Sequence, residues 1–491
     1  MARFFRYKTA AELLAEADTL RAQHPWRDVV PLPFELQQDL TPLFQPLQLA
    51  GRTIGNRLCI QPMEGCDGTL EGAPDTLTYR RYQRFGAGGA KLVWGEATAV
   101  RDDGRMNPRQ LCLHAGTVKA LEQMLSACRA AHREVYGGDD DLLIGLQLTH
   151  SGRYSCRLPL RAEACPLLDP RTRDPRTGQP IDPHLPIVTD AELAALVPAY
   201  VQAARWAHQI GCDFVDIKQC HRYLLSELLG AKRRPGEYGG TLERRSRLVR
   251  EIIQAIRVEV PGLIVATRLN VYDGVPYRRR AHDGRGEPVP SAEPVQTAFG
   301  VDSEVPERWQ PAEPLQLVRW LRDWGVQLIN VSLGNPYANP HLVRPADYPP
   351  IDGYEPPEHP LIGVMRHFAA TARIQQEVPD IAVVGSGYTW LQEFFPQAGA
   401  ANVAAGRCTF VGVGRGALSQ PDFARHLQET GRLQRKTICR TFSYCTNLMR
   451  TKDHPLGQYP TGCPPFDKEV YGPLWKEIEQ RSSPFSPVSS S

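Results

Sequence analysis

The sequence predicts an α/β protein folded as a (β/α)8 barrel. Eight short apolar runs, each followed by a helical period, fill residues 41–430. Several of these runs lack polar alternation, as parallel strands do when helices cover one face and a packed interior covers the other. The expected strands are Leu58–Pro62, Lys91–Gly95, Leu142–Thr149, Asp213–Lys218, Leu263–Leu269, Val326–Val331, Ile381–Val384 and Thr409–Val413. A doubly wound sheet has the same alternation, so periodicity alone leaves it open as the alternative.

The spacing of apolar residues between these runs predicts amphipathic helices. The expected helices are Val118–Val135, Asp190–Gln209, Leu242–Val258, Pro314–Trp324 and Gly363–Val378. Thr189 or Asp190 can cap the second of them, and Glu192 falls in its first turn, where the helix dipole favours an acidic side chain.

Two terminal extensions and two inserts interrupt the pattern. Residues 1–40 predict an N-terminal extension with one amphipathic helix, and residues 431–491 a C-terminal extension whose Ser/Pro-rich end is expected to be disordered. The inserts, at about 154–188 and 271–311, follow the third and fifth strands. They therefore belong to the barrel face where active sites lie, either as lids or as disordered decoration.

The composition indicates a folded protein without a polyanionic partner. Of the 491 residues 42% are hydrophobic and 23% charged, and the net charge of +3 is too small to predict binding to nucleic acid or to an acidic membrane surface. No run approaches the length of a membrane-spanning helix. The first residues lack the apolar core of a signal peptide and the twelve cysteines are scattered, so a reducing cytoplasm is the expected compartment.

Chemically reactive side chains gather after the fourth expected strand. Lys218 ends that strand, and His221 and Tyr223 follow in the loop at the barrel mouth. A cation and an imidazole can hold a substrate oxyanion, and a phenol can deliver a proton. A solvated lysine beside a packed tyrosine would give the same sequence, so this stretch alone leaves both interpretations open.

Further motifs occur in a fixed order along residues 41–425. They are Leu43-Phe44 through Gly55-Asn56-Arg57, Trp94-Gly-Glu-Ala-Thr-Ala-Val with Gly104-Arg105, Gln147-Leu-Thr-His-Ser-Gly-Arg, Lys218 to Tyr223, Tyr238-Gly-Gly-Thr-Leu-Glu-Arg-Arg, and Phe410-Val-Gly-Val-Gly-Arg with Pro421-Asp422. In this order they resemble the motifs of the Old Yellow Enzyme family of FMN-dependent ene reductases and their dienoyl-CoA-reductase-like relatives.

The resemblance implies an FMN site at the barrel mouth. Gln147 would bind the pyrimidine edge through its amide, and Arg268 would place a fixed cation near the N1/O2 edge. Two glycine loops would hold the phosphate, after the last two strands as is usual in barrels. The implied contacts are Pro62, Met63, Ala97, Gln147, Arg268, Gly385, Ser386, Gly387, Gly414 and Arg415.

The resemblance also implies a reaction. Lys218 and His221 would hold a carbonyl or nitro oxygen of a small-molecule substrate, hydride would pass from flavin N5 to an activated C=C bond, and Tyr223 would protonate the neighbouring carbon. NADH or NADPH would reduce the flavin. A flavin dehydrogenase or demethylase acting oxidatively, a non-catalytic flavin-binding partner subunit and a phosphate-binding barrel without flavin remain alternatives, and homo-oligomerisation stays open.

Three positions depart from the family pattern. Lys218 replaces an imidazole, Arg222 replaces a glycine, and Glu64 stands where a small or sulfur-bearing residue usually lies near the flavin. The Glu64 carboxylate would disfavour an anionic reduced flavin or serve as a base. Arg222 is expected to add bulk and charge to the substrate half of the mouth. Arg278–Arg280 could receive an anionic substrate or a 2′-phosphate, or could belong to a solvated loop.

The C-terminal extension carries three cysteines, Cys439, Cys445 and Cys463. Longer members of the family hold a four-cysteine iron–sulfur cluster after the barrel, followed by further nucleotide-binding domains. Phe442 stands where another cysteine would be expected, and cluster ligation normally needs four thiolates. The sequence therefore predicts neither an iron–sulfur cluster nor another metal, and not the multidomain reductase.

Overall fold

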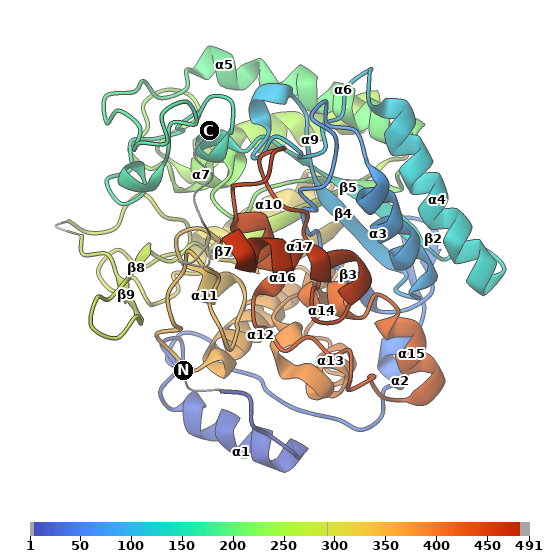
Figure 1. Ribbon diagram of the computed structural model, residues 1–491. Coiled ribbons are helices and arrows are strands. Elements are labelled where there is room, and N and C mark those ends of the chain that lie inside the picture. Colours follow the sequence, from blue (N-terminus) through green and yellow to red (C-terminus); the bar gives the residue numbers. More distant parts are fainter. Residues whose placement is uncertain (1–3, 292, 482–491) are drawn as a thin grey trace.

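The computed structural model, which describes residues 4–291 and 293–481, has a closed barrel of eight parallel strands at its centre (Figure 1). In order around the barrel these are β3 (Leu58–Ile60), β4 (Leu92–Ala99), β5 (Leu143–Thr149), β6 (Phe214–Ile217), β7 (Ile264–Tyr272), β10 (Leu328–Leu333), β11 (Ala382–Gly385) and β12 (Phe410–Val413). Val411 of β12 pairs with Leu58 of β3, which closes the ring. The barrel is confirmed, each predicted strand is present, and the doubly wound alternative is excluded.

Both faces of the barrel strands are buried, which explains their unbroken apolar runs. In β4, Leu92 and Trp94 point into the barrel and pack with residues such as Phe214 and Phe410, whereas Val93 belongs to the larger layer between strands and helices. Successive side chains of a strand point to opposite faces, so a strand with two buried faces shows no regular alternation of polar and apolar positions. The barrel interior is therefore a packed core, and open space is left at the strand ends.

Helices surround the barrel, and short antiparallel strand pairs lie outside it. The helices are α1 (Ala10–Arg21), α2 (Thr41–Phe44), α3 (Thr76–Ala87), α4 (Val118–Tyr136), α5 (Asp190–Ala194), α6 (Leu196–Gln209), α7 (Leu224–Gly230), α8 (Leu242–Arg245), α9 (Arg247–Glu259), α10 (Ala312–Asp323), α11 (Pro340–Val343), α12 (Pro360–Glu377), α13 (Phe395–Ala404), α14 (Arg415–Ser419), α15 (Phe423–Thr430), α16 (Tyr444–Arg450) and α17 (Lys468–Arg481). The additional strand pairs are β1 (Leu47–Leu49) with β2 (Arg52–Ile54), and β8 (Tyr277–Arg279) with β9 (Gly286–Pro288).

Two helices predicted as continuous are divided. The predicted helix Asp190–Gln209 separates into α5 and α6 because Pro198 has no N–H to donate to the carbonyl of Ala194 and its ring crowds that carbonyl. Thr189 caps α5, accepting from the backbone N–H of Glu192 at 3.2 Å. The predicted helix Leu242–Val258 is divided at Ser246, whose hydroxyl donates to the Leu242 carbonyl oxygen at 2.8 Å and competes with the backbone ladder.

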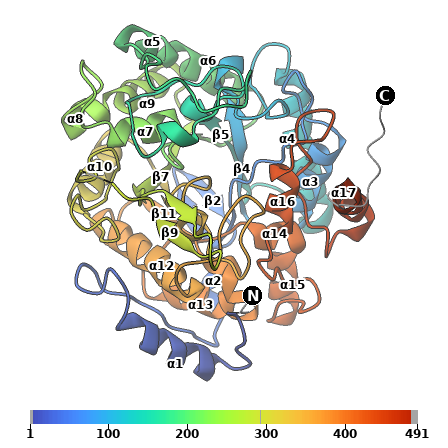
Figure 2. The ribbon, with the colours of Figure 1, turned by 60° about the vertical axis from the view of Figure 1, so that its left-hand side comes forward.

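The two extensions pack on different sides of the barrel. The N-terminal helix α1 lies beside α12, with Leu13, Ala17 and Leu20 buried, as its predicted amphipathic character requires (Figures 1 and 2). The C-terminal extension returns across the barrel to α3, where Arg80 pairs with Asp467 at 2.7 Å. Its helices α16 and α17, red in Figure 1, lie in front of the barrel strands in that view. The end expected to be disordered falls on residues 482–491, outside the described residues.

The insert after β5 contains little regular structure, yet buried ion pairs hold it in place. Asp169 accepts from Arg153 at 2.9 Å and from Arg161 at 2.8 Å. The insert after β7 contains the β8–β9 hairpin, and β7 itself continues to Tyr272, past the predicted start of that insert. Within the described part of the chain, no helix is both long and apolar enough to cross a membrane.

Candidate active site

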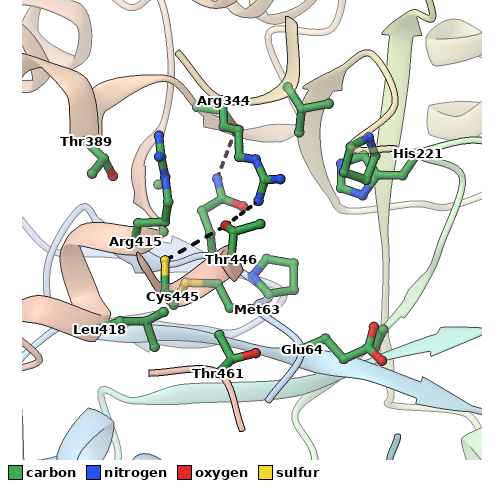
Figure 3. Close-up of a pocket in the computed structure, with 18 of the residues that line it drawn as sticks. Met63, Glu64, His221, Arg344, Thr389, Arg415, Leu418, Cys445, Thr446 and Thr461 are labelled. Atoms are coloured by element: carbon green, nitrogen blue, oxygen red, sulfur yellow. Dashed lines mark hydrogen bonds between the residues drawn. The ribbon is translucent and has the colours of Figure 1, made fainter. Parts of the chain in front are cut away.

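A cavity opens where the carboxyl ends of the barrel strands meet (Figure 3). All the residues predicted for the site line this cavity except Gly385, which ends β11 and whose carbonyl oxygen accepts from Gln61 Nε2 at 3.3 Å. The lining residues that were predicted are Pro62, Met63, Ala97, Gln147, Lys218, His221, Tyr223, Arg268, Ser386, Gly387, Gly414 and Arg415. The structure therefore brings together residues from seven of the eight barrel strands or the loops that follow them, as parallel strands in a barrel allow.

Asp216 of β6 fixes the geometry of the floor of the cavity. Its buried carboxylate accepts from the amide of Gln147 at 2.6 Å and from the backbone N–H of Arg268 at 2.7 Å. A third bond, 2.8 Å long, comes from the indole Nε1 of Trp94. One amide N–H of Gln147 thus bonds Asp216, while the amide oxygen makes no hydrogen bond among the described residues. Asp216 lies in the predicted strand Asp213–Lys218, but nothing in the sequence indicated that it would orient two predicted site residues.

Both arginines predicted for the cofactor site carry N–H groups without acceptors. Arg268 Nε and Arg415 Nη1 are buried and have no hydrogen-bond partner among the described residues, although Arg415 Nη2 donates to the Pro345 carbonyl oxygen at 2.7 Å. Leaving a buried charged donor unpaired costs about 1–3 kcal/mol or more. Both positions therefore suit an anionic group, and FMN offers one at its phosphate and one at its pyrimidine edge.

The glycine loops leave room at the same place. Gly387 has a φ of 94°, a conformation that favours glycine, and it precedes the turn Tyr388–Phe394. A side chain built on Gly414 would face the cavity, with Met63 Sδ and Gln61 Cβ both 3.8 Å from its Cβ. Because a ligand backbone or phosphate could occupy this space, the loops fit the flavin phosphate that the sequence assigned to them.

The predicted substrate residues stand together on one wall. The Lys218 ammonium lies 3.6 Å from the centroid of the Tyr223 ring, and the Tyr223 hydroxyl is 3.0 Å from that of Tyr337. His221 Nε2 is 3.0 Å from the Ser332 hydroxyl. Burial, together with the charges of Arg268 and Lys218, holds the pKa of His221 well below its ordinary value. The imidazole is therefore neutral at neutral pH and can offer an N–H donor without a full charge.

Burial also sets the protonation of the other two groups. It lowers the pKa of Lys218 and raises that of Tyr223, with Tyr337 and Glu64 adding to the rise for Tyr223. Tyr223 thus remains a phenol with a proton to give. Lys218 has a carboxylate, Glu64, close enough to favour its charged form and offset part of the desolvation.

Arg222 does not face the cavity, so the expectation that it adds bulk and charge to the substrate half is wrong. Its buried guanidinium donates to Asp273 at 2.8 Å, which neutralises the charge. His221 and Arg222 have φ angles of 65° and 61°, in the left-handed region that non-glycine residues rarely occupy. The ion pair holds the backbone in this conformation, and the conformation directs His221 and Tyr223 into the cavity.

Glu64 faces the substrate residues from β3's end. Asn107 donates through Nδ2 to its Oε1. Burial raises the pKa of Glu64 to about 7, against the opposing effect of Lys218. This carboxyl group can therefore exchange a proton near neutral pH at the position next to Met63.

Much of the remaining wall was missed from the sequence. The loop after β10 contributes Tyr337, Arg344 and Pro345, and the turn after β11 contributes Thr389 and Trp390. The C-terminal extension also lines the cavity, through Cys445, Thr446, Met449, Arg450 and Thr461. These residues show no periodicity or motif that could have placed them here.

Two further groups of residues bear on expectations from the sequence: the arginines of the hairpin insert and the cysteines of the C-terminal extension. Arg278 and Arg280 lie on the hairpin insert, paired with Glu287 at 2.7 Å and Asp283 at 2.5 Å, and do not line the cavity. Cys445 lines the cavity and Cys463 is buried. Within residues 4–291 and 293–481, no three or more histidine, cysteine or acidic side chains are grouped so that they could hold a metal ion.

The closed parallel barrel and its cation-rich cavity define a (β/α)8-barrel protein whose carboxyl face fits a phosphorylated cofactor. A family model described as the NADH:flavin oxidoreductase / NADH oxidase family matches residues 42–286. An NADPH dehydrogenase from Geobacillus sp. (strain WCH70) is 31% identical over 255 residues, 49% of this chain and 69% of that protein. The chain belongs to the NADH:flavin oxidoreductase / NADH oxidase family.

Solved structures agree with this fold. A 2-naphthoyl-CoA reductase complex has a TM-score of 0.60 at 16% identity, over 83% of this chain and 54% of that one. The chain thus spans about half the length of that reductase. The old yellow enzyme homologue from Zymomonas mobilis has a TM-score of 0.57 at 20% identity, over 80% of this chain and 94% of that one. The resemblance to the Old Yellow Enzyme family is confirmed, and membership makes the chain an FMN-dependent NAD(P)H oxidoreductase.

Proposed function

We propose that this protein uses NAD(P)H to reduce a C=C bond conjugated to a carbonyl or nitro group. The observation that carries the proposal is the convergence of Lys218, His221 and Tyr223 on one wall of the cavity that also contains the flavin-type loops. FMN, when bound, supplies the hydride. The chain's own residues bind the acceptor oxygen, orient the double bond and deliver the proton.

Lys218 and His221 are proposed to hold the acceptor oxygen. The ammonium of Lys218 stabilises the negative charge that develops there, and the neutral imidazole of His221 adds a directed N–H donor. His221 is oriented by Ser332, whose hydroxyl lies 3.0 Å from Nε2. In the family pattern an imidazole stands at the position of Lys218. The lysine ammonium is a compact charge on a flexible side chain, so it can reach substrate oxygens at more than one position.

Tyr223 is proposed to protonate the carbon next to the one that receives hydride. Its raised pKa keeps the proton in place until a carbanion-like centre forms. The hydroxyl of Tyr337, 3.0 Å away, can pass a proton back to Tyr223 after each turnover. We propose roles in the flavin site for Gln147, Arg268 and the two glycine loops as the sequence assigned them, supported by the unpaired donors described above.

A second candidate is oxidation of an alcohol or amine, and Glu64 is the observation that favours it. A carboxyl group with a pKa of about 7 beside the cavity could remove the proton that such a substrate must lose.

We also propose a cytoplasmic location, supported by the twelve cysteines, all of which are free thiols among the described residues.

The test separates the two half-reactions of the FMN-loaded enzyme by stopped-flow absorbance. In Tyr223→Phe, flavin bleaching by NADH or NADPH should stay within about 3-fold of wild type, whereas reoxidation by 2-cyclohexenone should slow by about 100-fold or more, the usual effect of losing a general acid. Tyr154→Phe is the matched control, because Tyr154 packs against Tyr223 yet bonds Asn335 at 2.6 Å instead of lining the cavity.

Three outcomes would decide against the proposal. Equal reoxidation rates in Tyr223→Phe and wild type over several activated alkenes would remove Tyr223 as the proton donor. Bleaching by amines or alcohols but by neither nicotinamide would establish the oxidative candidate. No bleaching and no alkene-dependent change in the flavin spectrum would leave a flavin-binding protein without this turnover.

A further inference from the structure

The cavity has a strong excess of positive charge. Its lining includes five cationic side chains and a single carboxylate, Glu64, within the described part of the chain. The cations are Lys218, Arg268, Arg344, Arg415 and Arg450. Under the proposed function, Arg268 and Arg415 serve FMN and Lys218 serves the acceptor oxygen. Arg344 then has no assigned anion, and Arg450, which pairs with Asp352, keeps an Nε without an acceptor among the described residues.

Arg344 follows helix α11, at the end of the loop after β10. Its Nη1 donates to the Thr446 hydroxyl at 2.9 Å, and Figure 3 shows the side chain reaching toward Thr446 with Arg415 and Cys445 nearby. Its Nε and Nη2 are buried without a hydrogen-bond partner among the described residues. Burial, Arg450 and Arg415 lower the pKa of Arg344 to about 9, which reflects the uncompensated positive charge around it.

Arg450 comes from α16, in the C-terminal extension. Its Nη1 pairs with Asp352 at 2.7 Å and its Nη2 donates to the Pro336 carbonyl oxygen at 2.9 Å. Its guanidinium carbon lies 4.4 Å from the centroid of the Tyr337 ring, while Nε has no acceptor among the described residues. Because Tyr337 bonds Tyr223, Arg450 belongs to the substrate side of the cavity.

Arg344 also acts on that side. Its charge contributes to the low pKa of His221, so the two groups are within electrostatic range. Thr446 and Arg450 lie one helical turn apart on α16, where positions i and i+4 share a face. The loop after β10 therefore positions the unpaired N–H groups of Arg344, and one face of α16 positions the unpaired N–H of Arg450.

We propose that Arg344 and Arg450 form a subsite for a carboxylate carried by the substrate. The preferred substrate is then an unsaturated carbonyl compound that also bears an acid group, with its acceptor oxygen at Lys218 and His221 and its carboxylate at the two arginines. The inference rests on the proposed function. It also assigns the C-terminal extension a direct role in substrate selection, and it places the anion away from Arg278 and Arg280 of the hairpin insert.

The experiment compares an acid with its neutral ester on the FMN-loaded enzyme. The probes are 3-oxocyclohex-1-ene-1-carboxylate and its methyl ester, which share the activated double bond and differ in charge. Wild type should favour the acid in kcat/KM, and Arg344→Met should lose about 10- to 100-fold on the acid, the usual worth of a charge-assisted hydrogen bond. Turnover of the ester should stay within about 3-fold, because its ester group makes no comparable charge-assisted bond.

Two further variants separate local contact from general charge and from misfolding. Arg278→Met removes an exposed cation outside the cavity and should leave the acid preference unchanged. Arg344→Lys keeps the charge and should retain part of the preference. Isothermal titration of the oxidised holoenzyme with the acid measures the same contact without turnover, and its Kd should rise by the same factor in Arg344→Met.

The competing source of an anion is the flavin phosphate or the 2′-phosphate of NADPH. If Arg344→Met weakens FMN binding strongly while the acid-to-ester ratio persists, Arg344 serves the flavin and the inference is overturned. A selective loss of NADPH over NADH with an unchanged ratio overturns it as well. If wild type reduces neither probe, the proposed function fails, whereas the titration still decides the carboxylate subsite: equal Kd values in wild type and Arg344→Met would reject it.

Discussion

Replacing Glu64 with glutamine should change how the stability of the protein depends on pH. In the folded protein the pKa of Glu64 is about 7, against 4.5 for an unperturbed glutamate. A carboxyl group whose pKa is raised on folding binds its proton more tightly in the native state. Stability from this group is therefore fully present below about pH 4.5 and is lost as the pH rises through about 7.

The size of the effect follows from the two pKa values. Their difference, about 7 minus 4.5, corresponds to about 3 kcal/mol at about 1.4 kcal/mol per pKa unit. Glu64→Gln removes this proton uptake and preserves an oxygen that can accept from Asn107. The difference in unfolding free energy, wild type minus variant, should thus fall by about 3 kcal/mol between about pH 4.5 and about pH 8.

The assay is urea unfolding of the FMN-free forms at several pH values, because bound flavin would add its own stabilisation. Glu122→Gln is the control: Glu122 is exposed on α4, and its wild-type-minus-variant difference should be flat over the same range. A Glu64→Gln difference that stays constant within about 0.5 kcal/mol, the usual scatter of such comparisons, would refute the raised pKa and with it the view that Glu64 exchanges a proton near neutrality.

Two other substitutions test the backbone around the site. Arg222→Gly should relieve about 1–3 kcal/mol of strain from the left-handed backbone conformation. It should also lose about 3–5 kcal/mol of stability, because Asp273 is left buried without its cation, so urea unfolding should show net destabilisation. Net stabilisation would contradict the structural role of the ion pair. Gly86→Ala should lower the stability measured by thermal unfolding by about 1–3 kcal/mol, because the new Cβ would meet the Cys128 carbonyl oxygen where α3 packs on α4. Gly138→Ala is the control and should be nearly neutral, because a Cβ there meets nothing within 4 Å.

The barrel strands could be predicted because their signal is local. A strand buried on both faces appears as an uninterrupted apolar run, and the runs containing Ile60, Ile144 and Val383 show this without any tertiary information. The division of helix Asp190–Gln209 was also readable in principle, since Pro198 stands in its interior. Periodicity obscured it because α5 and α6 bury the same side of the chain.

Features that depend on distant partners could not be predicted. Arg222 looked like a charge added to the mouth because its partner, Asp273, lies 51 residues away in another loop. Asp216 looked like an ordinary strand residue until Trp94, Gln147 and Arg268 were seen to converge on it. A buried polar side chain gives no pattern in one sequence that says which donors it will meet.

The cavity is lined by residues from inside and from outside the part of the chain that matches the family, and this division indicates which residues set substrate specificity. The family model matches residues 42–286, which include Gln147, Lys218 and Arg268, whereas Tyr337, Arg344 and Arg450 come from the chain beyond that match. Barrels change substrates by changing the loops that follow their strands, while the strands keep the cofactor in place. Here Arg344 from such a loop meets Thr446 from α16, and Arg450 of the same helix stacks on Tyr337. Because each arginine takes part of its support from the other element, the proposed carboxylate subsite depends on both helix α16 and the β10 loop.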